Sequence, residues 1–448
     1  MKHSIRMVCA ASAMMAGGAQ LPAVADDIAV FEQGAAVATA TREVALEAGA
    51  QALAWPGLPN SLLAETLLLQ SDQVSLLGSR FVRDALGQYA LLSQSVGEKV
   101  LLLRGDGAGG DVRREATLIS ANGPLVLTEG RYEVIDGNSP WRIAWQALPS
   151  GQPPGPGLSL NVDAETAGSH ALALTYQFGG LNWSADYVGR YDEAADTLAL
   201  RAQASIRNEA GHFDDARLVL ISGEIARESG GGGPRPQMMR MAMADSASEK
   251  VSAEAAFEYY RYALPGTFDL VSGETRNVTL FDEQSLKVER RYVIEGGWRN
   301  SSAGEQPTAN PEIRLDFDNG LERPLPAGSI RVYDSGEPPM LLGEDSIQHT
   351  AQNGHVSLTL GRAFDISAER RVTEDNREGK ARESSRRITV SNAKQSAVQV
   401  RVIESLPGDW EITSQNLPHE RLDAHRVVWV VGVPPGGKAS LIYGVTWR

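Results

Sequence analysis

The chain has 448 residues, which is enough for roughly two to four domains with hydrophobic cores of ordinary size. It carries 56 acidic and 42 basic side chains, and the formal net charge of −14 argues against a surface that neutralises nucleic-acid phosphates or anionic lipid. A composition of 42% hydrophobic and 22% charged residues excludes a collagen, a coiled coil and a disordered chain.

The first 25 residues have the pattern of a secretory signal peptide. Lys2 and Arg6 give it a basic start, residues 7–18 are small and apolar, and Ala23-Val24-Ala25 offers a cleavage site of the small-x-small type. The apolar stretch is too short to span a bilayer well, and an uncleaved N-terminal anchor is the alternative. The pattern therefore predicts export.

Cleavage after Ala25 would also remove Cys9, the single cysteine of the chain. An exported protein without disulfides is stabilised by packing alone, which suits the periplasm of a Gram-negative bacterium. No later segment has about 18 consecutive apolar residues. The mature chain is therefore expected to be periplasmic or associated with the cell envelope, and not integral to the membrane.

Apolar residues alternate with polar ones along most of the chain, as they do on strands that bury one face. The sequence therefore predicts an all-β protein. One helical candidate lies between Ser79 and Leu92, where an extended strand is the alternative. The clearest alternating runs are Leu172, Leu174, Tyr176 and Phe178; Leu198, Leu200, Ala202, Ala204 and Ile206; Val356, Leu358 and Leu360; and Leu441, Tyr443, Val445 and Trp447.

Changes in composition predict the domain organisation. An N-terminal β module at 26–148 is followed by a linker rich in proline and glycine at 149–160 and by an all-β region at 161–448. A stretch at 229–250 has no periodicity, and it is expected to be a mobile loop within that region. Short strands and glycine turns at 97–148 suit a small SH3-like barrel, and the region after the linker suits tandem immunoglobulin-like β-sandwich units.

Three asparagines mark a weak internal similarity. Asn208, Asn319 and Asn392 each end an alternating run, and a gap rich in turn residues precedes the next run. Asparagine bonds its own backbone and tolerates left-handed geometry, so it suits a turn at the end of a strand. The pattern indicates one sandwich hairpin used repeatedly.

Motifs of nucleophilic catalysis, phosphate binding and helical zinc binding do not occur in the sequence. Two histidine pairs, His349 with His355 and His419 with His425, could meet across hairpins and bind a metal, although surface turns are the better explanation for them. The run 316–320 spaces its oxygens as calcium loops do but lacks the distal glutamate, and a polar turn fits the same residues. No cofactor is expected, and an enzyme with carboxylates assembled across strands stays open.

Two groups of side chains are candidates for binding. The methionine thioethers in the 229–250 loop could bind Cu(I). The alternatives are a flexible contact surface that adapts to its partner and a linker whose methionines have no specific role. Aromatic rings near residue 260, together with two rings near residue 185, could stack on sugars or on a partner peptide, and the start of a sandwich core is the alternative. The methionines are Met238, Met239, Met241 and Met243, and the aromatic residues are Trp183, Tyr187, Tyr259, Tyr260 and Tyr262, with Phe257 beside them.

The most distinctive run is Tyr176-x-x-Gly179-Gly180-x-x-Trp183-x-x-x-Tyr187, within LALTYQFGGLNWSADY. Together with ITVSNAKQSAVQVRVIESLPGDWEI and the closing GGKASLIYGVTWR, it resembles the family called domain of unknown function 4139, whose relatives include mucoidy-inhibitor-like proteins. The resemblance implies bacterial export and an all-β body, and it implies no catalytic residues. The helical coiled-coil insertion of many of those relatives is not seen in this sequence.

These observations favour an exported, envelope-associated β protein that is a non-catalytic interaction or structural module. Its expected partner is a protein or an envelope polysaccharide, and not a nucleic acid. The alternative is a carbohydrate-binding or carbohydrate-processing protein that uses the aromatic residues.

Overall fold

The computed structural model describes residues 27–82, 87–107, 109–146, 156–223, 252–256, 259–297, 308–378 and 381–447. These residues form 31 β-strands and one short helix, so the all-β prediction is confirmed. None of the helices in the described part of the chain is long and apolar enough to cross a membrane. The predicted signal peptide at 1–25 and the predicted mobile loop at 229–250 lie outside the described residues.

The chain divides into two compact units, and it passes between them more than once. The first unit takes Met1–Asn182 together with two later segments, Arg207–Val219 and Leu264–Glu274. The second unit takes the remaining segments, including Thr275–Arg448. The division of the chain at the predicted linker, 149–160, stays a prediction, because most of that linker lies outside the described residues.

Two sheets of the first unit are built around the long strands β2 and β12 and around β11. The strand order is β15-β1-β2-β12-β4 in the larger sheet, with β18 also paired to β15, and β3-β11-β5 in the smaller one. The predicted alternation from Leu172 to Phe178 lies on β12, where its four apolar residues are all buried. The strands are β1 (Asp27–Phe31), β2 (Ala35–Leu46), β3 (Gly49–Pro56), β4 (Leu62–Gln70), β5 (Val74–Val82), β11 (Gly157–Ala164), β12 (Gly168–Gly179), β15 (Phe213–Ser222) and β18 (Phe268–Leu270).

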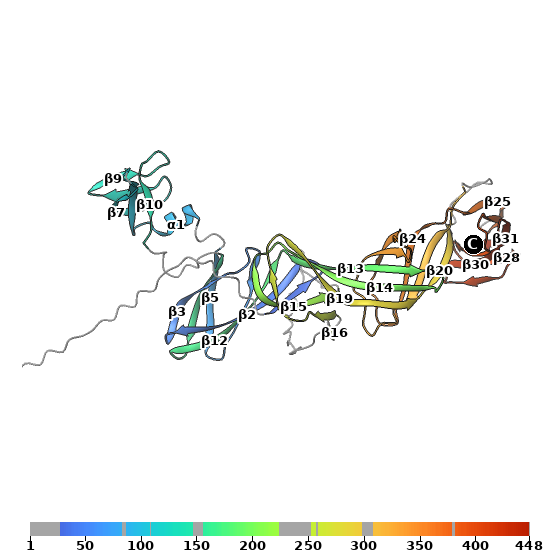
Figure 1. Cartoon of the computed structure of the whole chain (residues 1–448), viewed down its shortest axis with the longest axis horizontal. Coiled ribbons are helices and arrows are strands. Elements are labelled where there is room, and N and C mark those ends of the chain that lie inside the picture. The colour runs from blue at the N-terminus through green and yellow to red at the C-terminus, as the bar shows by residue number, and fades with distance from the viewer. Residues whose placement is uncertain are drawn as a thin grey trace, which may run out of the picture. The chain divides into compact units, whose positions relative to one another are not determined.

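A small module at 87–146 has its own sheet and its own core (Figure 1). Helix α1 (Gln88–Gln94) precedes five antiparallel strands in the order β10-β6-β7-β8-β9. Their inner face packs on a cluster that includes Leu92, Leu102 and Leu118. The strands are β6 (Lys99–Gly105), β7 (Asp111–Ser120), β8 (Leu125–Thr128), β9 (Arg131–Val134) and β10 (Arg142–Ala144).

Two sequence predictions concern this module: the SH3-like barrel and the helix between Ser79 and Leu92. The SH3-like barrel is not formed, because in the described part of the module no pairing joins β9 to β10 and the sheet stays open. The helical candidate between Ser79 and Leu92 is half right, since its first residues continue β5 and its last residues lie in α1.

The second unit begins with a five-stranded sheet in the order β19-β14-β13-β22-β23. Strands β13 and β22 are parallel, and β22 and β23 are antiparallel. A hairpin joins β16 to β17. These strands are β13 (Leu181–Asp192), β14 (Thr197–Asn208), β16 (Ser252–Ala256), β17 (Tyr259–Ala263), β19 (Glu274–Lys287), β22 (Gly328–Asp334) and β23 (Leu341–Ile347).

The C-terminal part of this unit is a β-sandwich, in agreement with the predicted class. One sheet has the order β24-β21-β20-β27-β30-β29, and the other has the order β25-β26-β31-β28. The first contains β20 (Glu289–Gly297), β21 (Glu312–Asp318), β24 (His355–Arg362), β27 (Val398–Ser405), β29 (His419–Arg421) and β30 (Arg426–Val433). The second contains β25 (Ile366–Glu378), β26 (Ala381–Asn392), β28 (Trp410–Gln415) and β31 (Lys438–Trp447).

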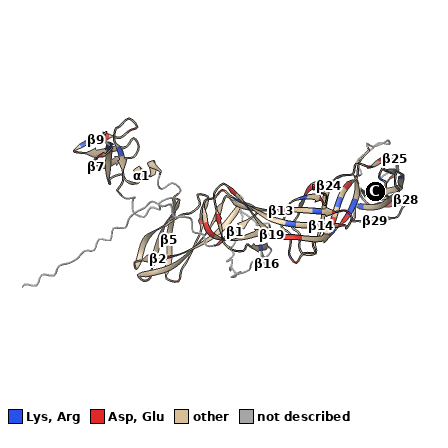
Figure 2. Ribbon diagram, viewed as in Figure 1, with Lys and Arg blue, Asp and Glu red and all other residues tan. Residues whose placement is uncertain are grey.

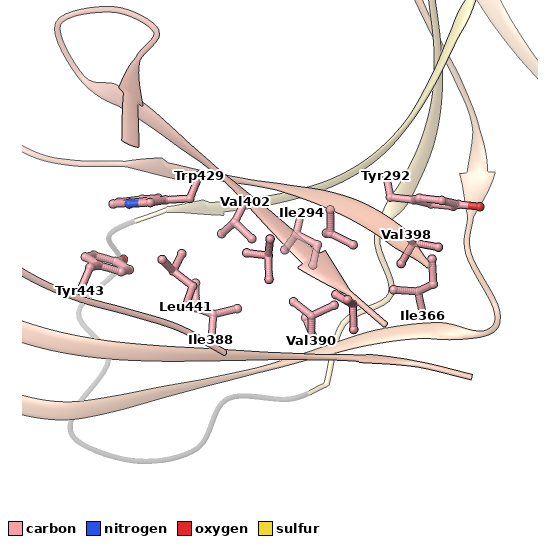
Figure 3. Close-up of a cluster of buried hydrophobic side chains, with 14 of the residues drawn as sticks. Tyr292, Ile294, Ile366, Ile388, Val390, Val398, Val402, Trp429, Leu441 and Tyr443 are labelled. Atoms are coloured by element: carbon pink, nitrogen blue, oxygen red, sulfur yellow. The ribbon is translucent and has the colours of Figure 1, made fainter. Parts of the chain in front are cut away.

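The two sheets of this sandwich enclose an apolar core of valine, isoleucine and aromatic side chains (Figure 3). At one end of the cluster the rings of Trp429 and Tyr443 stack with their centroids 4.5 Å apart. At the other end Tyr292, Val398 and Ile366 lie together (Figure 3). Alternate residues of each strand therefore meet between the layers, as the period-two pattern predicts.

Three buried asparagines close turns with the same hydrogen bonds, and they are those that the sequence singles out. In each, the side-chain oxygen accepts from the backbone N–H two residues later, and the amide nitrogen donates to a carbonyl three or four residues later. The amide therefore holds the chain as it leaves one strand for the next. They are Asn208 at the end of β14, Asn319 directly after β21 and Asn392 at the end of β26.

Replacing one of these amides should destabilise the sandwich. Asn392 donates to the carbonyls of Ser396 and Pro434 at 2.9 and 3.1 Å, and it is 2% exposed. Asn392→Ala leaves these buried acceptors without a donor, so we expect the free energy of unfolding to fall by about 3 kcal/mol. Urea denaturation followed by tryptophan fluorescence measures the loss.

Asn416 provides the matched control, because it makes the same kinds of bond at the surface. Its amide donates to the Ser440 carbonyl at 2.8 Å and accepts from the Ile442 N–H at 2.7 Å, while its side chain is exposed. Water can replace these partners, so Asn416→Ala should cost about 1 kcal/mol or less. Equal losses in the two variants would contradict the role given to the buried amide.

Candidate interaction surface

Three of the five predicted aromatic binding residues lie in the core of the second unit. Trp183 and Tyr187 on β13 and Tyr262 on β17 are each at most 2% exposed. The Trp183 indole N–H donates to the Ile221 carbonyl at 3.1 Å, and the Tyr187 hydroxyl donates to the Pro326 carbonyl at 2.7 Å. Rings buried in this way have no face left for a sugar, so the core interpretation applies to them.

The other sequence candidates are less enclosed or lie elsewhere. Tyr259 and Tyr260 are half-buried on β17 and stay candidates for binding. Phe257 lies outside the described residues, as do the four methionines proposed for copper, Met238, Met239, Met241 and Met243.

Neither predicted histidine pair is brought together as an opposed pair on a hairpin. His419 lies opposite Trp429, and its Nδ1 contacts the Gln415 side-chain oxygen at 2.7 Å. His355 lies opposite Asp318, with 3.0 Å between Nδ1 and a carboxylate oxygen. In the part of the chain that the structure describes, no group of three or more histidine, cysteine, aspartate or glutamate side chains could hold a metal ion.

The run 316–320 forms a structural turn in place of a calcium loop. Asp316 is 7% exposed and pairs with Arg291 at 2.8 Å. Asp318 contacts His355, and the Asn319 amide donates to the Arg323 carbonyl at 2.8 Å. One oxygen of Asp316 and one oxygen of Asp318 are thus engaged by neighbours within the protein, while Asp316 Oδ1 is buried without a hydrogen-bond partner.

The outer face of the five-stranded module carries a set of partly or fully exposed apolar side chains. Leu101 and Leu103 on β6 alternate with the buried Leu102, so their side chains point away from the core. Tyr132 and Val134 on β9 are 67% and 57% exposed. We call this surface the outer apolar face; it consists of Leu101, Leu103, Ile119, Leu125, Leu127, Tyr132 and Val134.

Cross-strand pairing makes this face continuous over β8 and β9. Leu125 lies opposite Val134, and Leu127 lies opposite Tyr132. Ile119, at the bulge in β7, is 37% exposed next to them. Single exposed apolar residues are ordinary on proteins, but a contiguous set on one sheet indicates a contact surface.

Charged residues lie within this face as well as around it: Glu115 and Arg113 on the central strand β7 lie opposite Leu101 and Leu103, and Figure 2 shows acidic and basic residues along the strands of the module. Arg142 pairs with Asp111 at 2.8 Å, and Lys99 lies 3.9 Å from Glu115. These exposed pairs have little effect on stability.

The sequence interpretation missed this surface, although a signal was present. The strands contain continuous apolar runs, Val100-Leu101-Leu102-Leu103 and Leu125-Val126-Leu127. Antiparallel strands with one solvated face alternate apolar and polar residues. A continuous run on such a strand therefore means that both faces are apolar.

A second unusual feature is an ionic cluster between the layers of the C-terminal sandwich. Glu404 on β27 is fully buried, and its carboxylate lies 2.9 Å from Arg370 and 3.5 Å from Arg386 on the opposite sheet. Gly296 makes room, because a Cβ there would lie 1.8 Å from an Arg370 nitrogen. Burial, and then the negative charge of Glu404, raise the pKa of Tyr443 well above 10.

Residues 172–448 match the model of a family described as a domain of unknown function, DUF4139. The chain belongs to this family. The resemblance seen in the sequence is thus confirmed, and the match includes the three turn asparagines and the ionic cluster. The five-stranded module and its outer apolar face precede the matched residues. No curated protein matches the chain.

Neutralising Glu404 should destabilise this DUF4139 protein strongly. Glu404→Gln keeps the size of the side chain but leaves Arg370 and Arg386 without their shared carboxylate. Breaking a buried ion pair on one side costs about 3–5 kcal/mol, and we expect a loss of this size in the free energy of unfolding. Chemical denaturation measures it.

Glu344→Gln is the matched control. Glu344 pairs with Arg331 at 3.3 Å, and both side chains are about half exposed, at 57% and 44%. Exposed pairs contribute about 0–1 kcal/mol. A Glu404→Gln loss no greater than that of the control would refute a stabilising role for the buried cluster.

Proposed function

We propose that this DUF4139 protein is exported to the periplasm or cell envelope, where it is a non-catalytic interaction module that binds a protein partner through the outer apolar face. The observation that carries the proposal is the exposure of that face on a sheet whose other face already has a complete core. Apolar side chains that stay partly in water gain free energy when a partner buries them.

The chemistry of the face favours a protein over a polysaccharide. Six of its seven side chains are aliphatic, and Tyr132 is the single aromatic one. Sugars are bound by exposed rings flanked by hydrogen-bonding groups, whereas aliphatic side chains match the apolar centre of a protein interface. The carbohydrate alternative also relied on Trp183, Tyr187 and Tyr262, whose rings are buried. Aliphatic side chains offer no nucleophile and no general acid, so this surface favours a role in binding over a role in catalysis.

Export is supported by the N-terminal pattern of the sequence. A basic start, a short apolar stretch and Ala23-Val24-Ala25 have the order of a cleavable leader. The stabilising features described above, sheet packing, amide-bonded turns and buried ion pairs, do not depend on thiols. They therefore suit an oxidising compartment.

The binding test compares the protein with a variant whose outer apolar face is charged. Leu101→Lys combined with Ile119→Lys places two ammonium groups on the face, away from β9, and the lysine introduced on β6 would lie opposite Glu115 in the unchanged register. We expect a protein partner recovered from detergent-solubilised bacterial envelope by the unmodified chain to be reduced at least tenfold by the variant. Quantitative mass spectrometry of affinity-purified samples measures recovery.

The control is Leu77→Lys, which charges an apolar side chain on β5 that is 60% exposed. It should leave recovery of the partner unchanged. Recovery of polysaccharide without protein, or equal recovery by all three chains, would overturn the proposed function.

Export has a separate test. The full chain, expressed in a Gram-negative host, should be found in the periplasmic fraction with Asp26 as its first residue. Ala23→Leu and Ala25→Leu would block cleavage, because the peptidase site accepts only small residues. N-terminal sequencing and fractionation provide the readout. An unprocessed chain in the cytoplasm would contradict export without affecting the binding test.

A further inference from the structure

The edge of the five-stranded sheet beside β9 is open. Strand β9 is the last in the order β10-β6-β7-β8-β9, and in the described part of the chain no strand pairs with its outer side. Open edges present unpaired N–H and C=O groups to any chain able to add a strand. Binding of a second copy of the same chain at this edge goes beyond the proposed function, which concerns the outer apolar face and a different protein.

The hairpin between β8 and β9 determines which residues face the edge. Glu129 and Gly130 have φ values of 49° and 77°, as a two-residue type I′ turn requires. In such a hairpin Arg131, directly after the turn, bonds to its partner strand, and bonded positions alternate thereafter. The Ile135 N–H accordingly donates to the Pro124 carbonyl at 2.8 Å. The backbone groups of Tyr132 therefore point outward to the edge, as do those of Val134.

The side chains of this edge leave it unprotected. Tyr132 and Val134 are among the most exposed apolar residues of the module. Natural edges are usually guarded by proline, by lysine or by a bulge. Strand β9 has none of these, and its two charges, Arg131 and Glu133, have opposite signs.

Charge selects one register when β9 pairs with itself in the antiparallel direction. With the two-fold axis at Tyr132, each Arg131 lies opposite Glu133 of the other copy. Glu133 already pairs with Arg114 of its own chain at 3.2 Å, so each Arg131 joins an existing ion pair. With the axis at Glu133, two carboxylates face each other. Opposite charges directly across a sheet stabilise it, and like charges destabilise it. The first register also uses the outward N–H and C=O of Tyr132 in a closely spaced hydrogen-bonded pair.

We propose that two copies of the chain pair through β9, antiparallel and centred on Tyr132, to form one continuous ten-stranded sheet. The two-fold axis is then perpendicular to the sheet, so both outer apolar faces lie on the same side. The contact is small, because β9 has four residues. The dimer should therefore be weak and concentration-dependent.

Charge reversal tests the register. We expect the purified full chain to dimerise in sedimentation equilibrium. Arg131→Glu should weaken the dimer at least tenfold, because it places a second carboxylate opposite Glu133. Glu133→Arg should weaken it as much with two guanidinium groups; this variant also loses the pair with Arg114 within its own chain, so the mixture described next is the decisive arm. An equimolar mixture of the two variants should form heterodimers, because each acidic strand then meets a basic one. Arg142→Glu, on the opposite edge strand, is the control and should dimerise normally.

Cross-linking gives an independent measurement. In a Cys9→Ser background, Tyr132→Cys places two thiols at the two-fold axis, where opposed Cα atoms are about 5.5 Å apart and a disulfide can close. Val134→Cys should not cross-link, because its two copies are separated along the strands. Covalent dimers on non-reducing gels would support the proposal. Circular dichroism would check that each variant is folded.

Three results would overturn the proposal. They are a monomer at every concentration tested, a mixture of charge variants that does not associate, and capture by Tyr132→Cys of a foreign envelope polypeptide in place of a second copy. The double variant Leu101→Lys with Ile119→Lys leaves β9 intact and should still dimerise. Failure of the dimer and failure of the proposed function are therefore distinguishable.

Discussion

The burial of one face of each sheet against another layer is the constraint on which this structure depends. Almost every described element is a strand, and a strand has no internal hydrogen bonds, so each needs a neighbour for its backbone and a second layer for its apolar side chains. The C-terminal sandwich satisfies both needs, with Trp429 stacked on Tyr443 between its sheets. Stability is thus distributed over many cross-layer contacts.

A sandwich also has to end its strands without leaving backbone groups unsatisfied. Asn319 and Asn392 solve this problem with one amide each, which accepts from the departing chain and donates to carbonyls of the following loop. The solution works because the asparagine side chain is short and carries both a donor and an acceptor. The same physical need at several strand ends explains why the pattern recurs along the chain at irregular intervals.

The five-stranded module satisfies the constraint on one side only. Its inner face has a core around Leu102 and Leu118, while Tyr132 and Val134 on the other side stay in water. The sandwich shows the opposite deviation, a carboxylate at Glu404 between two layers that are otherwise apolar. The first deviation provides a surface for binding. The second is tolerated because arginines from the facing sheet compensate the buried charge.

The sequence by itself determined the all-β class, the family and the turn asparagines, because period-two alternation and asparagine turns are local and leave their mark on neighbouring residues. It could not decide whether Trp183 and Tyr187 are buried or exposed, since an aromatic residue on a strand looks the same whichever layer covers it. Only the tertiary structure placed them in the core, left the small sheet open at β9, and brought Arg370 to Glu404 across the layers. Such pairings join residues far apart in the chain, and no local pattern records them.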